Sequence, residues 1–219
     1  MKDKKYRPLF RTCLFFARLF SKKRKVEGEI PQKPCVFVCR HLDENGVARS
    51  FIDIKKTMRP WVLDIFTDYK SAKKQFKEYT FSIRLKKSKL YCAVVSPIVA
   101  RGLTALVHSA RGIPVYRKEQ SSKSIQTIKQ SVRALEEGDS IVIYADIDYA
   151  SKDEKSEGEI YKGFSTVDAM FYKRNREHIP FVPVYIGKNK TIIHAPEFFE
   201  ENREETLEKI KRKMFNETA

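Results

Sequence analysis

The chain has 219 residues, 42% of them hydrophobic and 12% aromatic, which is enough for one globular domain with a full core and excludes a disordered chain. Its 44 Lys and Arg against 28 Asp and Glu give a formal net charge of +16. That charge favours an anionic partner: a membrane surface, a phosphorylated substrate or nucleic acid. The four cysteines lack C-x-x-C spacing, so we expect a reducing compartment and no metal site.

The N-terminal segment has apolar residues at helical spacing from residue 9 to residue 20, flanked by Lys and Arg. This run is only about a dozen residues long, shorter than the ~20 residues of a bilayer span, and no small-residue cleavage site follows it. The pattern predicts that residues 1–25 form an amphipathic basic helix on an anionic membrane surface, and that residues 26–219 form a separate domain. The alternative is a helix packed on the protein's own core.

Strand and helix patterns alternate along the rest of the chain. We expect strands at 35–39, 112–117, 141–144, 181–186 and 190–194. We expect helices at 96–110, 121–137, 164–174 and 200–215, whereas residues 47–90 are mixed and strongly basic. The alternation predicts an α/β fold: a mixed, mostly parallel central sheet flanked by helices, with the amphipathic helix at the N-terminus.

Residues that carry chemistry follow the predicted strands. His41 ends the first apolar strand, where a side chain that titrates near neutral pH would stand at the mouth of a parallel sheet. Three further segments follow in order: Gly112 to Arg117, the strand 141–144 running into Asp146 and Asp148, and a Val-Pro-Val run centred on Pro183.

In this order and spacing the four segments resemble the glycerolphosphate and lysophosphatidic acid acyltransferase superfamily over roughly residues 10–195. The family has a strand followed by Asn-His and a later Asp, then Gly-x-x-x-x-Arg, then a strand leading into Phe-Pro-Glu-Gly-Thr-Arg-Ser, then Val-Pro-Val. The run from Glu136 to Tyr144 is similar to the approach to the third block, and 161–164 to the segment just beyond it. The sequence departs from the family where Arg40 replaces Asn, Gly46 replaces Asp, and Asp146 replaces Glu.

The resemblance implies that the chain transfers a fatty acyl group from a thioester of CoA or acyl carrier protein to the hydroxyl of a lysophospholipid or glycerol-phosphate acceptor. His41 would be the base, with Asp43 (or Glu44), Asp146 or Asp148 as the orienting carboxylate. Arg117 and Arg40 would hold the acceptor phosphate, because a guanidinium fork matches phosphate oxygens. Gly112 and Pro183 complete the implied substrate site.

The implied setting is phospholipid biosynthesis at the cytoplasmic face of a membrane, to which the protein binds peripherally, with the thioester as co-substrate and no other cofactor. The missing Asp and the missing third-block Arg leave an alternative open: a catalytically inactive relative that binds lipid or a partner protein. No nucleic-acid partner is expected, because the sequence has no helix-turn-helix, zinc-ligand or aromatic RNA-binding signature. His108 lies in an apolar helix and is expected to be a packed or capping residue there rather than a catalyst.

Overall fold

A computed structural model describes residues 5–41, 43–116, 122–146, 160–200 and 202–216, and for 43–45 it describes the backbone. Within these residues seven strands form one sheet in the order β1-β7-β6-β2-β5-β3-β4. All neighbouring strands are parallel except β6 and β7, so the predicted mixed, mostly parallel sheet is confirmed. The strands are β1 (Lys25–Glu27), β2 (Val36–Cys39), β3 (Met58–Leu63), β4 (Ile113–Val115), β5 (Ser140–Tyr144), β6 (Phe181–Ile186) and β7 (Lys190–Ile193).

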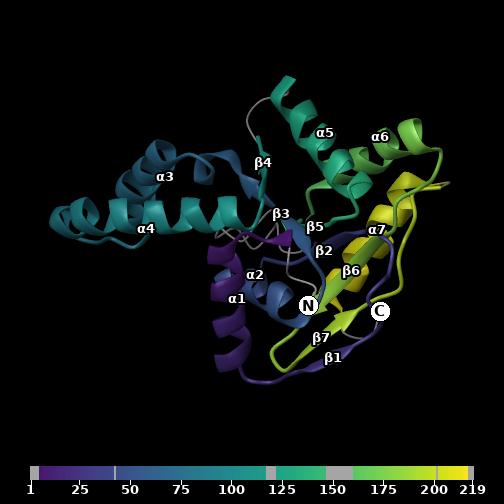
Figure 1. Cartoon of the computed structure of the whole chain (residues 1–219), viewed down its shortest axis with the longest axis horizontal. Coiled ribbons are helices and arrows are strands. Elements are labelled where there is room, and N and C mark those ends of the chain that lie inside the picture. Colours follow the sequence, from purple (N-terminus) through teal and green to yellow (C-terminus); the bar gives the residue numbers. More distant parts are fainter. Residues whose placement is uncertain (1–4, 42, 117–121, 147–159, 201, 217–219) are drawn as a thin grey trace.

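One face of the sheet is covered by three helices, α5 (Ser122–Glu136), α6 (Thr166–Asn175) and α7 (Arg203–Phe215) (Figure 1). A short 3-10 turn, η5 (Lys162–Ser165), leads into α6. Val36, Val38, Ile141 and Ile143 point from the central strands into this face. Alternate residues of a strand point to opposite faces, so these positions fix which side of β2 and β5 each following residue takes.

The other face carries α1 (Pro8–Phe20) and α2 (Asp43–Asp53). Phe37, Cys39 and Val142 point into it from the sheet, and Leu14 of α1 and Phe51 of α2 close over them. α1 therefore packs on the core along one side. Its other side leaves large apolar side chains in solvent: Leu9, Phe15, Phe16, Leu19 and Phe20.

A helical arm, residues 69–109, stands off the sheet between β3 and β4. After the turn η2 (Asp64–Phe66) it comprises α3 (Tyr69–Gln75), the π-helical segment η3 (Phe76–Arg84) and α4 (Lys89–Ser109). α4 packs lengthwise against α3 and η3, and the arm extends away from the sheet (Figure 1). The sequence predicts a helix only from residue 96, so α4 begins earlier than expected.

An ionic cluster anchors the base of the arm to the sheet. Asp139, 1% exposed, accepts from Arg59 of β3 at 2.8 Å and from Arg111, just after α4, at 2.8 Å. Lys5 approaches the same carboxylate at 2.8 Å, and Glu137 pairs with Arg59 at 2.5 Å. A buried carboxylate of this kind is stable only because cations surround it. The cluster joins β3, the α4–β4 turn, the N-terminus and the turn before β5.

Candidate functional site

The carboxyl ends of β2 and β5 meet at His41 and Asp146. The two strands are parallel neighbours, with Cys39 opposite Tyr144. Two residues further on, the main-chain N–H of His41 donates to Oδ1 of Asp146 at 2.7 Å. Burial, and secondarily the charge of Asp146, raises the pKa of the Cys39 thiol well above its usual value. The sheet mouth therefore holds the main chain of His41 against the carboxylate of Asp146.

The His41 ring lies on the face of the sheet that α1 and α2 cover. It packs edge-on against Tyr144, with ring centroids 5.7 Å apart. Tyr144 packs on the same core as Cys39, two residues before His41. The strand alternation carries Asp146 to this face as well, two residues beyond Tyr144. The imidazole and the carboxylate thus share one side of the sheet.

Tyr144 is held in place by Ser50 of α2. The Ser50 hydroxyl donates to the Val47 carbonyl at 2.8 Å, so the Tyr144 hydroxyl donates to Ser50 Oγ at 2.6 Å. Burial raises the pKa of Tyr144 well above its usual value. Tyr144 is therefore a neutral phenol at physiological pH. Its ring is held in a fixed position and packs against one side of the imidazole.

Gly46 lies in the first turn of α2, directly against the main chain that leaves β2. A Cβ built at Gly46 would lie 2.3 Å from the His41 carbonyl oxygen and 2.6 Å from the Arg40 carbonyl oxygen. Real Cβ atoms do not come so close to backbone atoms. The position that holds Asp in the resembling family therefore has no room here for any side chain.

Arg40 takes the opposite side of the sheet from His41. Its guanidinium carbon lies 4.3 Å from the ring centroid of Phe215, the last residue of α7. A guanidinium over an aromatic face gains roughly 0.5–2 kcal/mol from the ring quadrupole. Arg40 Nε is buried without a hydrogen-bond partner among the described residues. Adjacent residues of an extended chain diverge in this way, so Arg40 and His41 face different surroundings.

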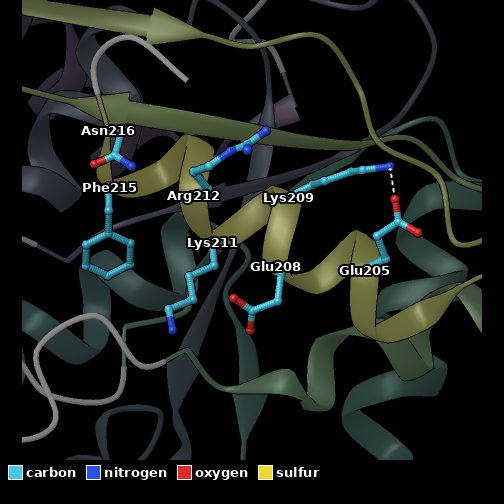
Figure 2. A pocket seen from close by; sticks show the side chains of 7 residues that line it. All are labelled: Glu205, Glu208, Lys209, Lys211, Arg212, Phe215 and Asn216. Carbon is cyan, nitrogen blue, oxygen red and sulfur yellow. Dashed lines mark ion pairs between the residues drawn. The ribbon is translucent and has the colours of Figure 1, made fainter.

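The outer face of α7 carries a hollow of about 620 Å³. Figure 2 shows its lining side chains, among which Lys209 pairs with Glu205 at 2.7 Å. Phe215 links this hollow to Arg40. Its lining residues are Glu205, Glu208, Lys209, Lys211, Arg212, Phe215 and Asn216.

Gly112 and Pro183 lie inside the fold. Gly112 precedes β4 and packs closely, since a Cβ there would meet a Val107 methyl at 3.0 Å and a Val62 methyl at 3.2 Å. Pro183 is buried in β6 opposite Val38 of β2. Both positions bring elements together beside the strands that carry His41 and Asp146.

Three predicted site residues are described in part or not at all. Asp43 is the first residue of α2, and its side chain lies outside the described residues. Arg117 and Asp148 lie wholly outside them. β4 runs parallel to β3, and β3 to β5, so the carboxyl end of β4 lies at the edge of the sheet where His41 stands.

Sequence reasoning did not single out Tyr144 and Ser50 as site residues. The signal for Tyr144 was its place as the last residue of a buried strand. That strand, β5, lies beside β2, the strand that leads to His41. Ser50 had no signal, because its role depends on where α2 lies. In the part of the chain that the structure describes, no three His, Cys, Asp or Glu side chains gather in a way that could hold a metal ion.

The fold is shared with a solved acyltransferase. The 1-acyl-sn-glycerophosphate (LPA) acyltransferase PlsC from Thermotoga maritima is similar to this chain with a TM-score of 0.50 over 94% of this chain and 78% of that one. The two sequences are 14% identical, so the likeness is one of architecture. Neither a protein-family model nor a curated protein matches the sequence.

Proposed function

We propose that the chain is a peripheral acyltransferase that moves a fatty acyl group from a thioester to the hydroxyl of a phosphate-bearing lipid acceptor. The observation that carries the proposal is the meeting of His41 and Asp146 at the carboxyl ends of β2 and β5. These two residues lie in a fold shared with an LPA acyltransferase. A base and a carboxylate at the mouth of a parallel sheet are the groups that acyl transfer to a hydroxyl requires.

The proposed reaction needs one base and no metal. The imidazole of His41 takes the proton of the acceptor hydroxyl, and the oxygen attacks the thioester carbonyl carbon. The tetrahedral intermediate collapses as the carbon–sulfur bond breaks, and the imidazolium returns its proton to the leaving thiolate. The products are an ester and a free thiol of CoA or acyl carrier protein. Asp146 acts by fixing the His41 main chain and by placing negative charge beside the imidazolium.

The acceptor's phosphate is proposed to bind at the same edge of the sheet. Arg117, which comes two residues after β4 in the sequence, is the first candidate. Arg40 stacks on Phe215 and would have to leave that ring to join it, so we propose it as an auxiliary group. Gly112 and Pro183 support the site through packing.

The proposed site of action is the cytoplasmic face of an anionic membrane. The chain's net charge of +16 and the exposed aromatic side of α1 support this. Phe15, Phe16 and Phe20 are exposed by 63%, 49% and 79%. Within residues 1–25, α1 would then act as a membrane-surface helix that also packs on the core through Leu14.

A second candidate is an inactive relative that binds lipid or a partner protein. Gly46 favours it, because the backbone contact there excludes the carboxylate that the resembling family places at that position. Such a protein keeps the fold and the lipid-binding surfaces without turnover.

The two candidates separate in a thiol-release assay. Purified protein is mixed with long-chain acyl-CoA or acyl carrier protein thioester and with lysophosphatidic acid, and free thiol and diacyl product are measured. The enzyme should release thiol only when acceptor is present, and should prefer lysophosphatidic acid to monoacylglycerol, which lacks the phosphate. Vesicle binding with no diacyl product from either donor would support the inactive relative.

A further inference from the structure

Along residues 90–104 of the arm helix α4, the buried residues are small or polar, and several large apolar residues are exposed. The stripe that faces α3 and η3 consists of Cys92, Ser96, Ala100 and Thr104, all buried. Leu90, Val94 and Ile98 repeat every four residues on the outer side and are 76%, 55% and 68% exposed. A helix whose outer side meets water places such side chains on the core instead.

The exposed apolar surface continues onto the end of η3. Ile83 is 63% exposed and Leu85 49%. We group them with four exposed residues of α4, which begins four residues after Leu85, and call this set the arm patch. The arm patch consists of Ile83, Leu85, Leu90, Tyr91, Val94 and Ile98. Several large apolar side chains exposed on one arm indicate a binding site for another apolar body.

The arm patch is bordered by positive charge. Residues 69–109 contain nine Lys and Arg against one acidic residue, Glu78, and so carry half of the chain's net charge of +16. Lys86, Lys87 and Lys89 flank the arm patch, and all three side chains are exposed. Apolar side chains bordered by lysines complement a layer of anionic headgroups above an apolar interior.

We propose that the arm docks on an anionic phospholipid surface, with the arm patch in the interfacial layer and the lysines on headgroup phosphates. The inference deepens the proposed function, because it names a surface by which a lipid acyltransferase would reach its acceptor. A second copy of the chain fits less well, since it would bring two strongly positive arms together.

The arm lies on the membrane in this proposal and does not cross it. Among the described residues, α4 is the one helix whose length and composition would allow a span. However, α3 packs along α4 and carries Lys70, Lys73 and Lys74, which a spanning α4 would draw into the hydrocarbon. Burying those charges is costly, whereas at the interface they contact headgroups.

Hydrogen bonds join the arm to α1, the other helix with a large exposed apolar side. The main-chain N–H of Arg7 donates to the Ser109 carbonyl at 3.0 Å, and that of Phe10 donates to Ser109 Oγ at 2.8 Å. Ser109 ends α4, and Arg7 immediately precedes α1. The contact couples the arm to the N-terminal helix at a fixed junction.

The first test compares identical substitutions on the arm and elsewhere. Ile98→Asp and Ile83→Asp change the arm patch, and Ile125→Asp changes a 51% exposed isoleucine on α5. Co-sedimentation with phosphatidylglycerol–phosphatidylcholine vesicles, without acyl donor, should show at least about 10-fold weaker binding for the arm variants. Ile125→Asp should bind like the wild type. All variants should keep the wild-type melting temperature, since each site is exposed.

The second test changes charge. Lys86→Glu with Lys89→Glu should weaken binding to the same vesicles by at least about 25-fold, because each basic residue near an anionic surface contributes roughly a fivefold factor and the double variant loses two of them. Lys129→Glu with Lys173→Glu makes the same change in net charge at exposed sites on α5 and α6, and should cost much less. Raising the salt concentration should weaken wild-type binding and reduce the difference in vesicle affinity between the two double variants.

Three results would overturn the inference. If the Ile98→Asp variant binds vesicles as tightly as the Ile125→Asp variant, the arm patch does not contact the membrane. Wild-type binding to pure phosphatidylcholine vesicles that is as tight as binding to the anionic vesicles would show that anionic headgroups do not contribute. A lipid-free dimer that Ile98→Asp converts to monomer would make a second copy the occupant. None of these three results depends on turnover. A catalytically inactive protein would support the inference if its arm binds vesicles. An enzyme that is active on detergent-dispersed acceptor would contradict the inference if its arm does not bind vesicles.

Discussion

The main-chain N–H of His41 and the side-chain carboxylate of Asp146 are joined by a 2.7 Å hydrogen bond across the ends of two parallel strands. The bond uses a main-chain donor, so it holds the loop that leaves β2 whatever the protonation state of the imidazole. A hydrogen bond to a charged acceptor contributes about 1.5–3 kcal/mol. The carboxylate thereby orients the segment on which the proposed base stands.

Asp146→Ala should therefore affect both stability and turnover. The variant loses the acceptor for the His41 N–H, and we expect the free energy of unfolding to fall by about 1–3 kcal/mol and kcat by at least about 10-fold. Asp146→Asn keeps an oxygen acceptor without the charge and should recover most of the stability but little of the kcat. Urea unfolding and thiol release measure the two effects. An Ala variant with wild-type kcat would show that the carboxylate has no part in the reaction.

Gly46→Ala should be strongly destabilising. The new Cβ would collide with the carbonyl oxygens of Arg40 and His41, and relief requires α2 to shift away from β2. We expect a loss of about 1–3 kcal/mol or more. The control is Gly102→Ala in α4, where nothing lies within 4 Å of the added Cβ, and the better helix former should stabilise by about 0.5–1 kcal/mol. Equal unfolding midpoints for the two variants would contradict the close contact at Gly46.

Cys35 makes stability sensitive to alkaline pH. Burial raises the pKa of its thiol from 9.0 to about 11. The folded thiol stays protonated while the unfolded chain ionises, so stability is complete below pH 9.0 and falls by about 3 kcal/mol as pH rises to about 11. In Cys35→Ala this part of the loss should disappear. Urea unfolding across the range, in reductant, checks it, and Cys13→Ala on the exposed side of α1 is the control. A Cys35→Ala profile as steep as the wild type would refute the assignment.

Asp139→Ala should be among the more damaging substitutions in the chain. It leaves Arg59, whose side chain is 13% exposed, without its buried partner, and leaves Arg111 only its 3.5 Å ion pair with Glu137. Breaking a buried pair from one side costs about 3–5 kcal/mol. Asp68→Ala, which removes only the exposed cap of α3, should cost about 1 kcal/mol. Thermal unfolding compares them, and a loss at Asp139 no larger than at Asp68 would contradict the anchoring role.

Strong local patterns predicted most of the sheet. The strand at 181–186 appears as β6 with the same bounds, because both faces of it are buried and its residues are nearly all apolar. β3 was not predicted, since Arg59 and Pro60 stand within it and interrupt its run of apolar residues. The charge of Arg59 is tolerated only through Asp139 and Glu137, which are distant in sequence. α4 was predicted too short because its buried stripe is small and polar.

The candidate site was predictable as a location but not in its contacts. Two strands ending in His41 and Asp146 must meet if they are parallel neighbours, and the resemblance placed both at the site. That Asp146 binds the main chain of His41 depends on the register of β2 and β5, which the sequence does not encode locally. The Tyr144–Ser50 contact depends on the packing of α2. The divergence of Arg40 from His41 follows from strand alternation alone.

The most direct measurement is acceptor-dependent thiol release by His41→Ala beside His108→Ala. His108 lies exposed on α4, with Nε2 2.9 Å from the Thr67 carbonyl, and has no place in the proposed reaction. We predict that His41→Ala lowers kcat about 10²–10⁴-fold at an unchanged melting temperature, whereas His108→Ala keeps wild-type turnover. A His41→Ala protein that forms diacyl product at the wild-type rate would contradict the assignment of His41 as the base.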